Sequence, residues 1–240
     1  NFLEAVQALW FIFAFVRLCG NWPGIGRIDW LLGDYLQKDL AAGVLTKPEA
    51  REILASFFIK GCEWIQSQPR PGSGDAQHYQ NIVLAGIDAA GREVTNDVTY
   101  LVLDIVEELA IADFPITVRL NSRSPERLLR KTAQVMRHGG GIVAVYNEDL
   151  ILRALKNEGY PESEARSFAN DGCWEIQIPG KTDFAYMPFD ALQVFNRVLG
   201  VDSDGPVPAY PSAEALYQAF LEELKQTVEQ LYQSLSLIHI

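Results

Sequence analysis

The sequence predicts an α/β fold with buried, partly parallel strands. Three short runs of apolar and β-branched residues alternate with longer segments of helical periodicity, and these runs comprise residues 82–84, 116–120 and 142–146. Short continuous apolar runs are typical of strands covered by helices on both faces, as in parallel sheets. Because helices separate the runs, the connections are crossovers, which indicates α/β architecture.

The helices between and around these runs are marked by their capping residues. Thr46-Lys-Pro-Glu49 is a capping box with an early proline, and it opens a helix that extends to about Cys62. Three further starts are indicated, at Asn96 before a periodic apolar stripe, at Ser124-Pro125 before a helix that ends at glycines 139–141, and at Asn147 before one that closes near Gly159.

The first residues form an unbroken apolar run from Ala8 to Val16. Nine residues are too few to span a bilayer, and no basic leader precedes them, so neither a membrane span nor a signal peptide is predicted. We expect a helix that is buried on most sides. The chain begins without Met inside this helix, which we interpret as the start of an internal fragment.

The last residues divide into two parts. Residues 212–233 have the stripe of an amphipathic helix with Ser212 as its N-cap. Residues 235–240 depart from that pattern and resemble translated adaptor sequence from a sequencing library. We therefore interpret residues 1–234 as one fragment of a single domain and residues 235–240 as a non-native tail, and we exclude His239 from any site.

Composition and charge restrict the class of protein. The chain has 240 residues, 48% hydrophobic and 21% charged, which is typical of a globular protein with ample core. Its net charge of −11 argues against nucleic acid and anionic membranes as partners. The three cysteines, at positions 19, 62 and 173, form no C-x-x-C motif or Cys/His cluster. We therefore predict a reducing, cytoplasmic setting, with no disulfide framework and no metal site.

The candidate for chemistry is the segment from Asn170 to Lys181, which contains Cys173 and Glu175. Glycines and Pro179 argue against a helix here, and a loop or short strand is expected. In extended backbone, residues two apart point to the same side, so the thiol and the carboxylate are predicted to share one space. Such a pair joins a nucleophile or hydrogen-atom carrier to an acid/base group. A buried cysteine beside an unrelated surface glutamate is the alternative.

Other motifs are weaker. His138 with glycines 139–141 resembles an esterase oxyanion loop, but no G-x-S-x-G elbow accompanies it, so we interpret it as a helix end followed by a turn. A cysteine-hydrolase pair of Cys173 with His138 is kept as the rival enzyme class. Gly24-Ile-Gly26 lacks the third glycine of a dinucleotide fingerprint and is rejected.

A family resemblance rests on several motifs in one order. Gly172-Cys-Trp-Glu175, followed by Pro179-Gly-Lys-Thr182, resembles the cysteine loop of the glycyl radical enzymes, the relatives of pyruvate formate-lyase and glycerol dehydratase. In the dehydratase branch that loop reads Gly-Cys-Val-Glu. The blocks that resemble this branch upstream are Gly26-Arg-Ile-Asp29, Asp39-Leu-Ala-Ala-Gly43, Thr46-Lys-Pro-Glu-Ala50, Asn81-Ile-Val-Leu-Ala-Gly86, Asn96-Asp-Val-Thr-Tyr-Leu101 and Pro115 to Arg119 with Ser124-Pro125.

The resemblance implies part of a ten-stranded α/β barrel, with the catalytic cysteine on an inner loop. It further implies that a glycyl radical takes a hydrogen atom from Cys173 and that the thiyl then abstracts hydrogen from a small organic substrate. Glu175 would be the general acid or base of a lyase or dehydratase. The implied partners are a radical S-adenosylmethionine activating enzyme and a second subunit of a full-length homodimer, with no bound cofactor. The radical-bearing glycine is expected on a C-terminal segment missing from this chain, so the fragment alone is expected to be inactive.

Departures from the family pattern narrow the activity. Gly172 stands where pyruvate formate-lyase has a second cysteine, which argues against acyl transfer. Tyr186-Met187 stands where the diol dehydratases have His-Asp, which puts glycerol and propanediol in doubt. A decarboxylase or a C–C bond-forming enzyme with the same thiyl step, and an inactive barrel relative that acts as a binding protein, remain the alternatives.

Overall fold

The computed structural model describes residues 1–18, 24–62, 80–111, 114–172, 174–182, 189–201 and 205–238, with residues 17–18 and 235–238 in their backbone only. The chain divides into two compact units, Asn1–Phe184 and Ala185–Ile240. The larger unit contains the sheet and the candidate loop, and the smaller one is helical.

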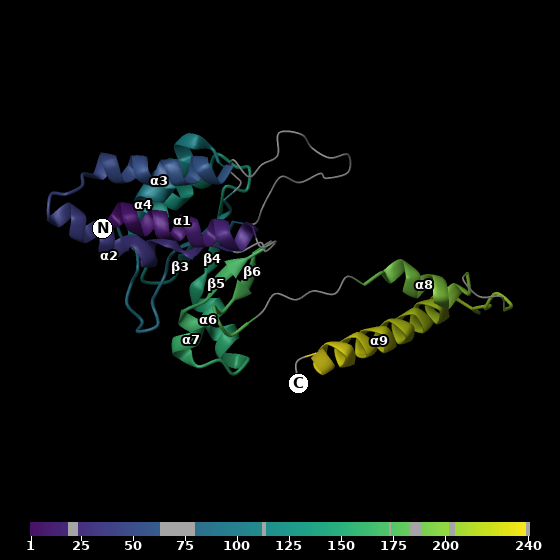
Figure 1. Ribbon diagram of the computed structural model, residues 1–240. Coiled ribbons are helices and arrows are strands. Elements are labelled where there is room, and N and C mark those ends of the chain that lie inside the picture. The colour runs from purple at the N-terminus through teal and green to yellow at the C-terminus, as the bar shows by residue number, and fades with distance from the viewer. Residues whose placement is uncertain are drawn as a thin grey trace. The chain divides into compact units, whose positions relative to one another are not determined.

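A four-stranded sheet forms the centre of the larger unit (Figure 1). Its strands are β1 (Gly26–Arg27), β2 (Ile82–Ala85), β3 (Ile116–Leu120) and β4 (Val143–Asn147), and each neighbouring pair is parallel in the order β1-β2-β3-β4. The predicted parallel α/β architecture is therefore confirmed. β1 was not predicted, because two residues carry no periodic signal.

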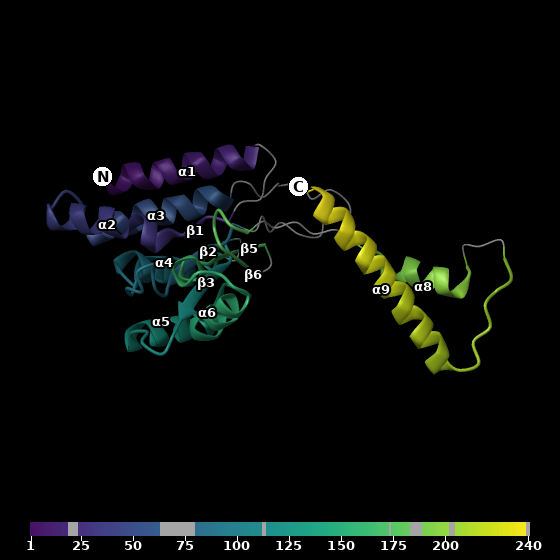
Figure 2. The same ribbon diagram turned by 90° about the horizontal axis from the view of Figure 1, so that it is seen from below.

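Helices connect the parallel strands. α2 (Ile28–Ala41) and α3 (Lys47–Cys62) lie between β1 and β2 in the chain, α4 (Asp97–Leu109) between β2 and β3, and α5 (Glu126–Met136) between β3 and β4, whereas α1 (Phe2–Leu18) precedes β1 and α6 (Glu148–Asn157) and α7 (Glu162–Arg166) follow β4. Of these, α1, α3, α4 and α5 lie side by side in this order (Figure 2). The predicted caps form: Thr46 and Glu49 bond each other's backbone N–H, and the Asn96 side chain accepts from Val98 N at 2.8 Å.

The two faces of the sheet have different chemistry. Ile82 and Leu84 of β2, with Ile116 and Val118 of β3, belong to the hydrophobic core shared with the helices. Alternate residues point the other way, and on β3 these are the fully buried Thr117 and Arg119. A two-stranded antiparallel hairpin, β5 (Ala169–Asp171) and β6 (Glu175–Gln177), lies next to β1 and β2. The polar face of the sheet is thus the face that positions the hairpin.

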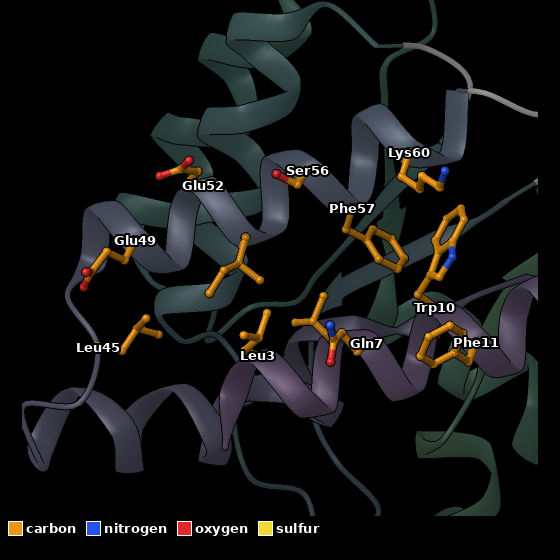
Figure 3. Close-up of a pocket in the computed structure, with 12 residues that line it drawn as sticks. Leu3, Gln7, Trp10, Phe11, Leu45, Glu49, Glu52, Ser56, Phe57 and Lys60 are labelled. Atoms are coloured by element: carbon orange, nitrogen blue, oxygen red, sulfur yellow. The ribbon is translucent and has the colours of Figure 1, made fainter.

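The first helix is less buried than the sequence predicts. α1 packs mainly against α2 and α3, and its residues Phe11, Ile12 and Phe15 remain more than half exposed. A groove of about 650 Å³ runs between α1 and α3, lined by apolar residues that include Trp10 and Phe57 (Figure 3). No residue of the hairpin lines this groove.

The smaller unit is a pair of helices, α8 (Ala191–Leu199) and α9 (Ala213–Ile238). Phe195 meets Phe220 edge to face at 5.6 Å, and Arg197 pairs with Glu223 at 2.9 Å. The last helix was predicted to end at residue 233, but it continues to Ile238 because the added residues extend its backbone hydrogen bonding. The non-native origin of residues 235–240 stays a prediction, and His239 lies outside the described residues.

Replacing Gly61 with alanine should destabilise the larger unit. Alanine is the better helix former by about 1 kcal/mol, but a Cβ at this buried position overlaps the ring of Phe114. Overpacking of this kind costs about 1–3 kcal/mol, so the unfolding free energy should fall. All five tryptophans lie within residues 1–184, so their fluorescence during denaturant unfolding reports on this unit. The exposed Glu52→Ala on the same helix is the control, with an expected change within about 0.5 kcal/mol.

Candidate active site on the hairpin

The candidate loop is the turn of the β5–β6 hairpin. Asp171 pairs with Glu175 and Asn170 with Ile176 across its two strands, so the turn comprises residues 172–174. Gly172 has φ 57° and Trp174 has φ 84°. The strand-or-loop prediction is confirmed. The prediction that the thiol of Cys173 and the carboxylate of Glu175 share one side stays a prediction, although Trp174 between them is not extended. Cys173 itself lies outside the described residues.

One end of the hairpin is fixed by Arg119. Its guanidinium lies 3.8 Å from the centre of the Phe168 ring and donates to the Phe168 carbonyl at 2.7 Å and to the Arg166 carbonyl at 2.9 Å. Glu148, the first residue of α6, accepts from Arg119 Nε at 2.8 Å and from Ile87 N at 3.0 Å. Burial lowers the pKa of Arg119 to about 10, which still leaves it charged at neutral pH. A buried ion pair thus holds the residues that lead into β5.

The turn end of the hairpin is held by residues that precede the strands of the sheet. Asn81, immediately before β2, donates from Nδ2 to the Gly172 carbonyl at 3.1 Å. Gly24 lies so close that a Cβ there would be 3.0 Å from the Asn170 carbonyl oxygen. The hairpin therefore runs along the polar face of the sheet, from Arg119 at one end to Asn81 at the other.

Tyr146 of β4 makes a third contact with the hairpin, and it connects the residue that leads into β5 with the turn. Its ring stacks on Phe168 with centroids 6.4 Å apart, and its hydroxyl donates to the Trp174 carbonyl. Burial, together with the negative charge of Glu175, raises the pKa of Tyr146 to about 12. The phenol therefore keeps its proton at neutral pH.

Glu175 and Asp171 form the acidic part of the site. Glu175 is partly buried, and its Oε2 has no hydrogen-bond partner among the described residues. Asp171 Oδ1 accepts from Gly172 N at 2.9 Å. Burial raises the pKa of Asp171 and the charge of Glu175 raises it further, against the opposing effect of that hydrogen bond. A carboxylate with an unpaired buried oxygen is chemically suited to accept or deliver a proton.

The segment Gly26-Arg-Ile-Asp29 supports the hairpin. Arg27 donates to the carbonyls of Ala85 and Ile87, both at 2.9 Å. Asp29 is fully buried and accepts from Ala85 N at 2.6 Å and Thr99 Oγ1 at 2.7 Å. Burial raises the pKa of Asp29. These residues join β1 to the end of β2, beneath the hairpin.

A cavity of about 420 Å³ lies beside the hairpin. Its lining combines the end of β1 and the start of α2 with the open end of the hairpin, opposite the turn, through Arg27, Trp30, Ala169 and Pro179. Glu175 is not among its lining residues. The lining is mostly apolar side chains, with Arg27 and Asp88 as charged members. Its position makes it the candidate cavity for a small molecule.

The remaining sequence candidates lie elsewhere or outside the described residues. His138 follows α5 in a turn toward β4, as predicted, and its ring contacts Glu107 of α4 at 3.1 Å. Glycines 139–141 all have positive φ, which fits a tight turn. The His138–Cys173 pair and the Tyr186-Met187 departure involve residues outside the described part. No group of three His, Cys, Asp or Glu side chains suited to a metal occurs among the residues that the structure describes.

Sequence reasoning missed Arg119, Glu148, Asn81 and Tyr146. One signal was available: a charged residue inside the apolar strand Ile116–Leu120 must be paired when the strand is buried.

No helix within the described ranges is long and apolar enough to span a bilayer.

Comparison with known proteins identifies the family. The chain matches the pyruvate formate lyase-like family over residues 1–240. It belongs to that family. The isethionate sulfite-lyase of Nitratidesulfovibrio vulgaris is 30% identical over 202 residues, which cover 80% of this chain and 24% of that protein.

Solved structures give the same result. A structure concerning 1,2-propanediol dehydration in Roseburia inulinivorans aligns with a TM-score of 0.80 and 27% identity, over 93% of this chain and 30% of that one. A glycyl radical enzyme from Archaeoglobus fulgidus aligns with a TM-score of 0.71 and 26% identity, over 88% and 29%. The predicted resemblance to glycyl radical enzymes of dehydratase or eliminase type is confirmed, as is the α/β barrel fold, of which this chain covers a part. The chain spans about a quarter to a third of the length of these proteins.

Removing the charge of Glu148 should lower the unfolding free energy of the larger unit. Glu148→Gln leaves the Arg119 guanidinium buried without a counter-charge, and breaking a buried ion pair costs about 3–5 kcal/mol of unfolding free energy. Tryptophan fluorescence in a denaturant titration measures the loss. Glu126→Gln, which breaks the exposed pair with Arg130 on α5, is the matched control and should cost at most about 1 kcal/mol. Equal effects of the two variants would contradict a structural role for the buried pair.

The pH dependence of stability should report on Asp171. Because its folded pKa is raised, the folded state holds this proton more tightly than the unfolded chain. Its contribution to stability is present below an unfolded pKa of about 4 and is lost as pH rises through the folded value. Asp171→Asn keeps the oxygen that accepts from Gly172 N but does not titrate. The unfolding free energy of the variant relative to the wild type should therefore rise between pH 4 and pH 7, and a difference independent of pH would contradict the assignment.

Proposed function

We propose that this chain contributes the cysteine loop of a glycyl radical lyase or dehydratase, with Cys173 as the hydrogen-atom carrier and Glu175 as the general acid or base. Membership of the family supports the radical chemistry. The observation that carries the assignment of Glu175 is its buried Oε2, which has no partner in the part of the chain that the structure describes, at the base of the turn.

The proposed cycle balances in atoms and electrons. A glycyl radical takes the hydrogen atom of the Cys173 thiol, which leaves a thiyl and a closed-shell glycine. The thiyl takes a hydrogen atom from a substrate carbon, so the unpaired electron moves to the substrate. Glu175 accepts a proton from a hydroxyl on the radical carbon and passes it to the leaving group as that group departs from the adjacent carbon, so the carboxylate ends the step as it began. The product radical then recovers the hydrogen atom from Cys173, and the thiyl regenerates the glycyl radical.

The environment of the hairpin suits this chemistry. The buried face of the sheet and the hydrogen bonds at Asn81 and Tyr146 hold the turn in a fixed position. Pre-positioned groups lower the barrier because the reacting atoms are already aligned. The cavity at the open end of the hairpin has a mostly apolar lining and offers space for a small organic molecule. Gly172 at the position of a second cysteine favours elimination over acyl transfer.

The rest of the machinery is proposed for the full-length protein. The radical-bearing glycine belongs to a segment beyond these 240 residues, and a radical S-adenosylmethionine activase generates the radical. The active form is a cytoplasmic homodimer, and the 240-residue chain alone is inactive.

Cys173→Ala in the activated full-length protein should abolish product formation. The glycyl radical signal in electron paramagnetic resonance should remain, because the glycine itself is unchanged. His138→Ala is the control and should leave turnover unchanged, which also tests the cysteine-hydrolase alternative. Absence of a glycyl radical in the wild type would reject the proposal, and retained turnover in Cys173→Ala would favour a different reaction class.

Glu175→Gln should retain the radical signal and lower kcat by about 100-fold or more, the usual contribution of general acid/base catalysis. Product analysis across diols, hydroxy acids, sulfonates and arylacetates separates elimination from decarboxylation, which shares the thiyl step. An unchanged kcat in the variant would remove Glu175 from the mechanism while leaving the radical chemistry in place.

A further inference from the structure

We propose that Tyr146 is a positioning residue, whose hydroxyl holds the hairpin turn in the strained conformation from which Glu175 enters its strand. The catalytic consequence rests on the proposed function, but the holding of the turn does not.

The position of Tyr146 is fixed from two sides. In β4 it pairs in register with Arg119 of β3. Arg119 lies over the ring of Phe168, and Phe168 stacks on Tyr146 at an interplanar angle of 23°. The phenol therefore has little freedom, and its hydroxyl is presented to the carbonyl of Trp174. A rigid donor of this kind can hold a backbone conformation that the sequence alone does not favour.

Trp174 is the residue that needs such support. Its φ of 84° lies in a backbone region that residues other than glycine, asparagine and aspartate rarely adopt. For a bulky aromatic residue this conformation is strained, and strain persists only where surrounding contacts impose it. Gly172, with φ 57°, adopts its own conformation without that difficulty.

The contacts that impose the turn come from the sheet. Asn81 Nδ2 binds the Gly172 carbonyl, and Tyr146 binds the Trp174 carbonyl, so the backbone is held on both sides of position 173. Of these two, Tyr146 acts on the strained residue itself. Glu175 follows directly, and the direction of its side chain depends on the φ and ψ of Trp174.

The hydroxyl of Tyr146 acts as a donor and not as an acid in the reaction. Its proton is used on the Trp174 carbonyl, and its pKa of about 12 keeps it in place through the range in which proteins are studied. Glu175 and Asp171 are the titrating groups at this end of the hairpin, and the charge of Glu175 favours retention of the phenol proton.

A double-mutant cycle in the 240-residue chain tests the holding of the turn. Tyr146→Phe keeps the ring and its stacking on Phe168 but removes the hydroxyl. Trp174→Gly removes the strain, since glycine adopts positive φ freely. The loss of unfolding free energy caused by Tyr146→Phe should fall to less than half in the Trp174→Gly background. Equal losses in both backgrounds would overturn the proposal. Trp174→Asn, which also tolerates this conformation, replaces Trp174→Gly if the glycine variant fails to fold.

Kinetics of the activated full-length protein test the positioning. Tyr146→Phe should lower kcat by up to about 100-fold, as small misplacements of reacting groups do, with KM and glycyl radical yield unchanged. Tyr210→Phe is the matched control, because the Tyr210 hydroxyl also donates to a backbone carbonyl, that of Val198 in the smaller unit. An unchanged kcat in Tyr146→Phe would overturn the positioning role. A wild type without a glycyl radical would reject the proposed function, while the stability cycle would still decide whether Tyr146 holds the turn.

Discussion

The buried ion pair between Arg119 and Glu148 is the interaction on which the hairpin depends. Both side chains are fully buried, and removing two charges from water is costly unless hydrogen bonds compensate. Here they do, since the guanidinium also donates to the carbonyls of residues 166 and 168, and Glu148 accepts from Ile87 N. One pair therefore joins the loop after β2, the junction of β4 with α6, and the entry to β5.

The Arg119–Glu148 pair also explains why position 86 is a glycine. Gly86 has φ 74°, and a Cβ there would overlap the Glu148 carboxylate and come close to the Arg119 side chain. The block Asn81-Ile-Val-Leu-Ala-Gly86 thus has a physical basis at both ends. Asn81 holds the hairpin turn, and Gly86 leaves room for the ion pair that holds the hairpin entry. The strand between them fills the core.

The elements that the sequence predicted correctly are those whose signal is local. The strand at residues 116–120 and the capped helices after Thr46 and Asn96 follow from apolar runs and caps, which act within a few residues. β1 has two residues and pairs with β2, a distant segment of the chain, while β5 and β6 have three residues each and pair with one another. No periodicity exists over so short a length.

The site was predictable only through the family resemblance. Spacing alone suggested a shared side for residues 173 and 175, and this stays a prediction because Cys173 lies outside the described residues. The positive φ of Trp174 shows that the backbone between them is not a regular strand, which no local pattern indicated. The sequence did not indicate a special role for Glu148, because acidic residues are common in the first turn of a helix. Tyr146 resembled any core aromatic. Its role depends on which backbone carbonyl lies above it, and that is decided by the tertiary structure.

The electrostatics of the hairpin connect its fold to the proposed chemistry. Asp171 and Glu175 are directly opposed across the two strands, where side chains lie about 5 Å apart. Two partly buried carboxylates at that separation repel each other, and the charge of Glu175 adds to the effect of burial in raising the pKa of Asp171. The raised pKa of Asp171 therefore connects the burial of the hairpin to the electrostatic surroundings of the residue for which we propose proton transfer.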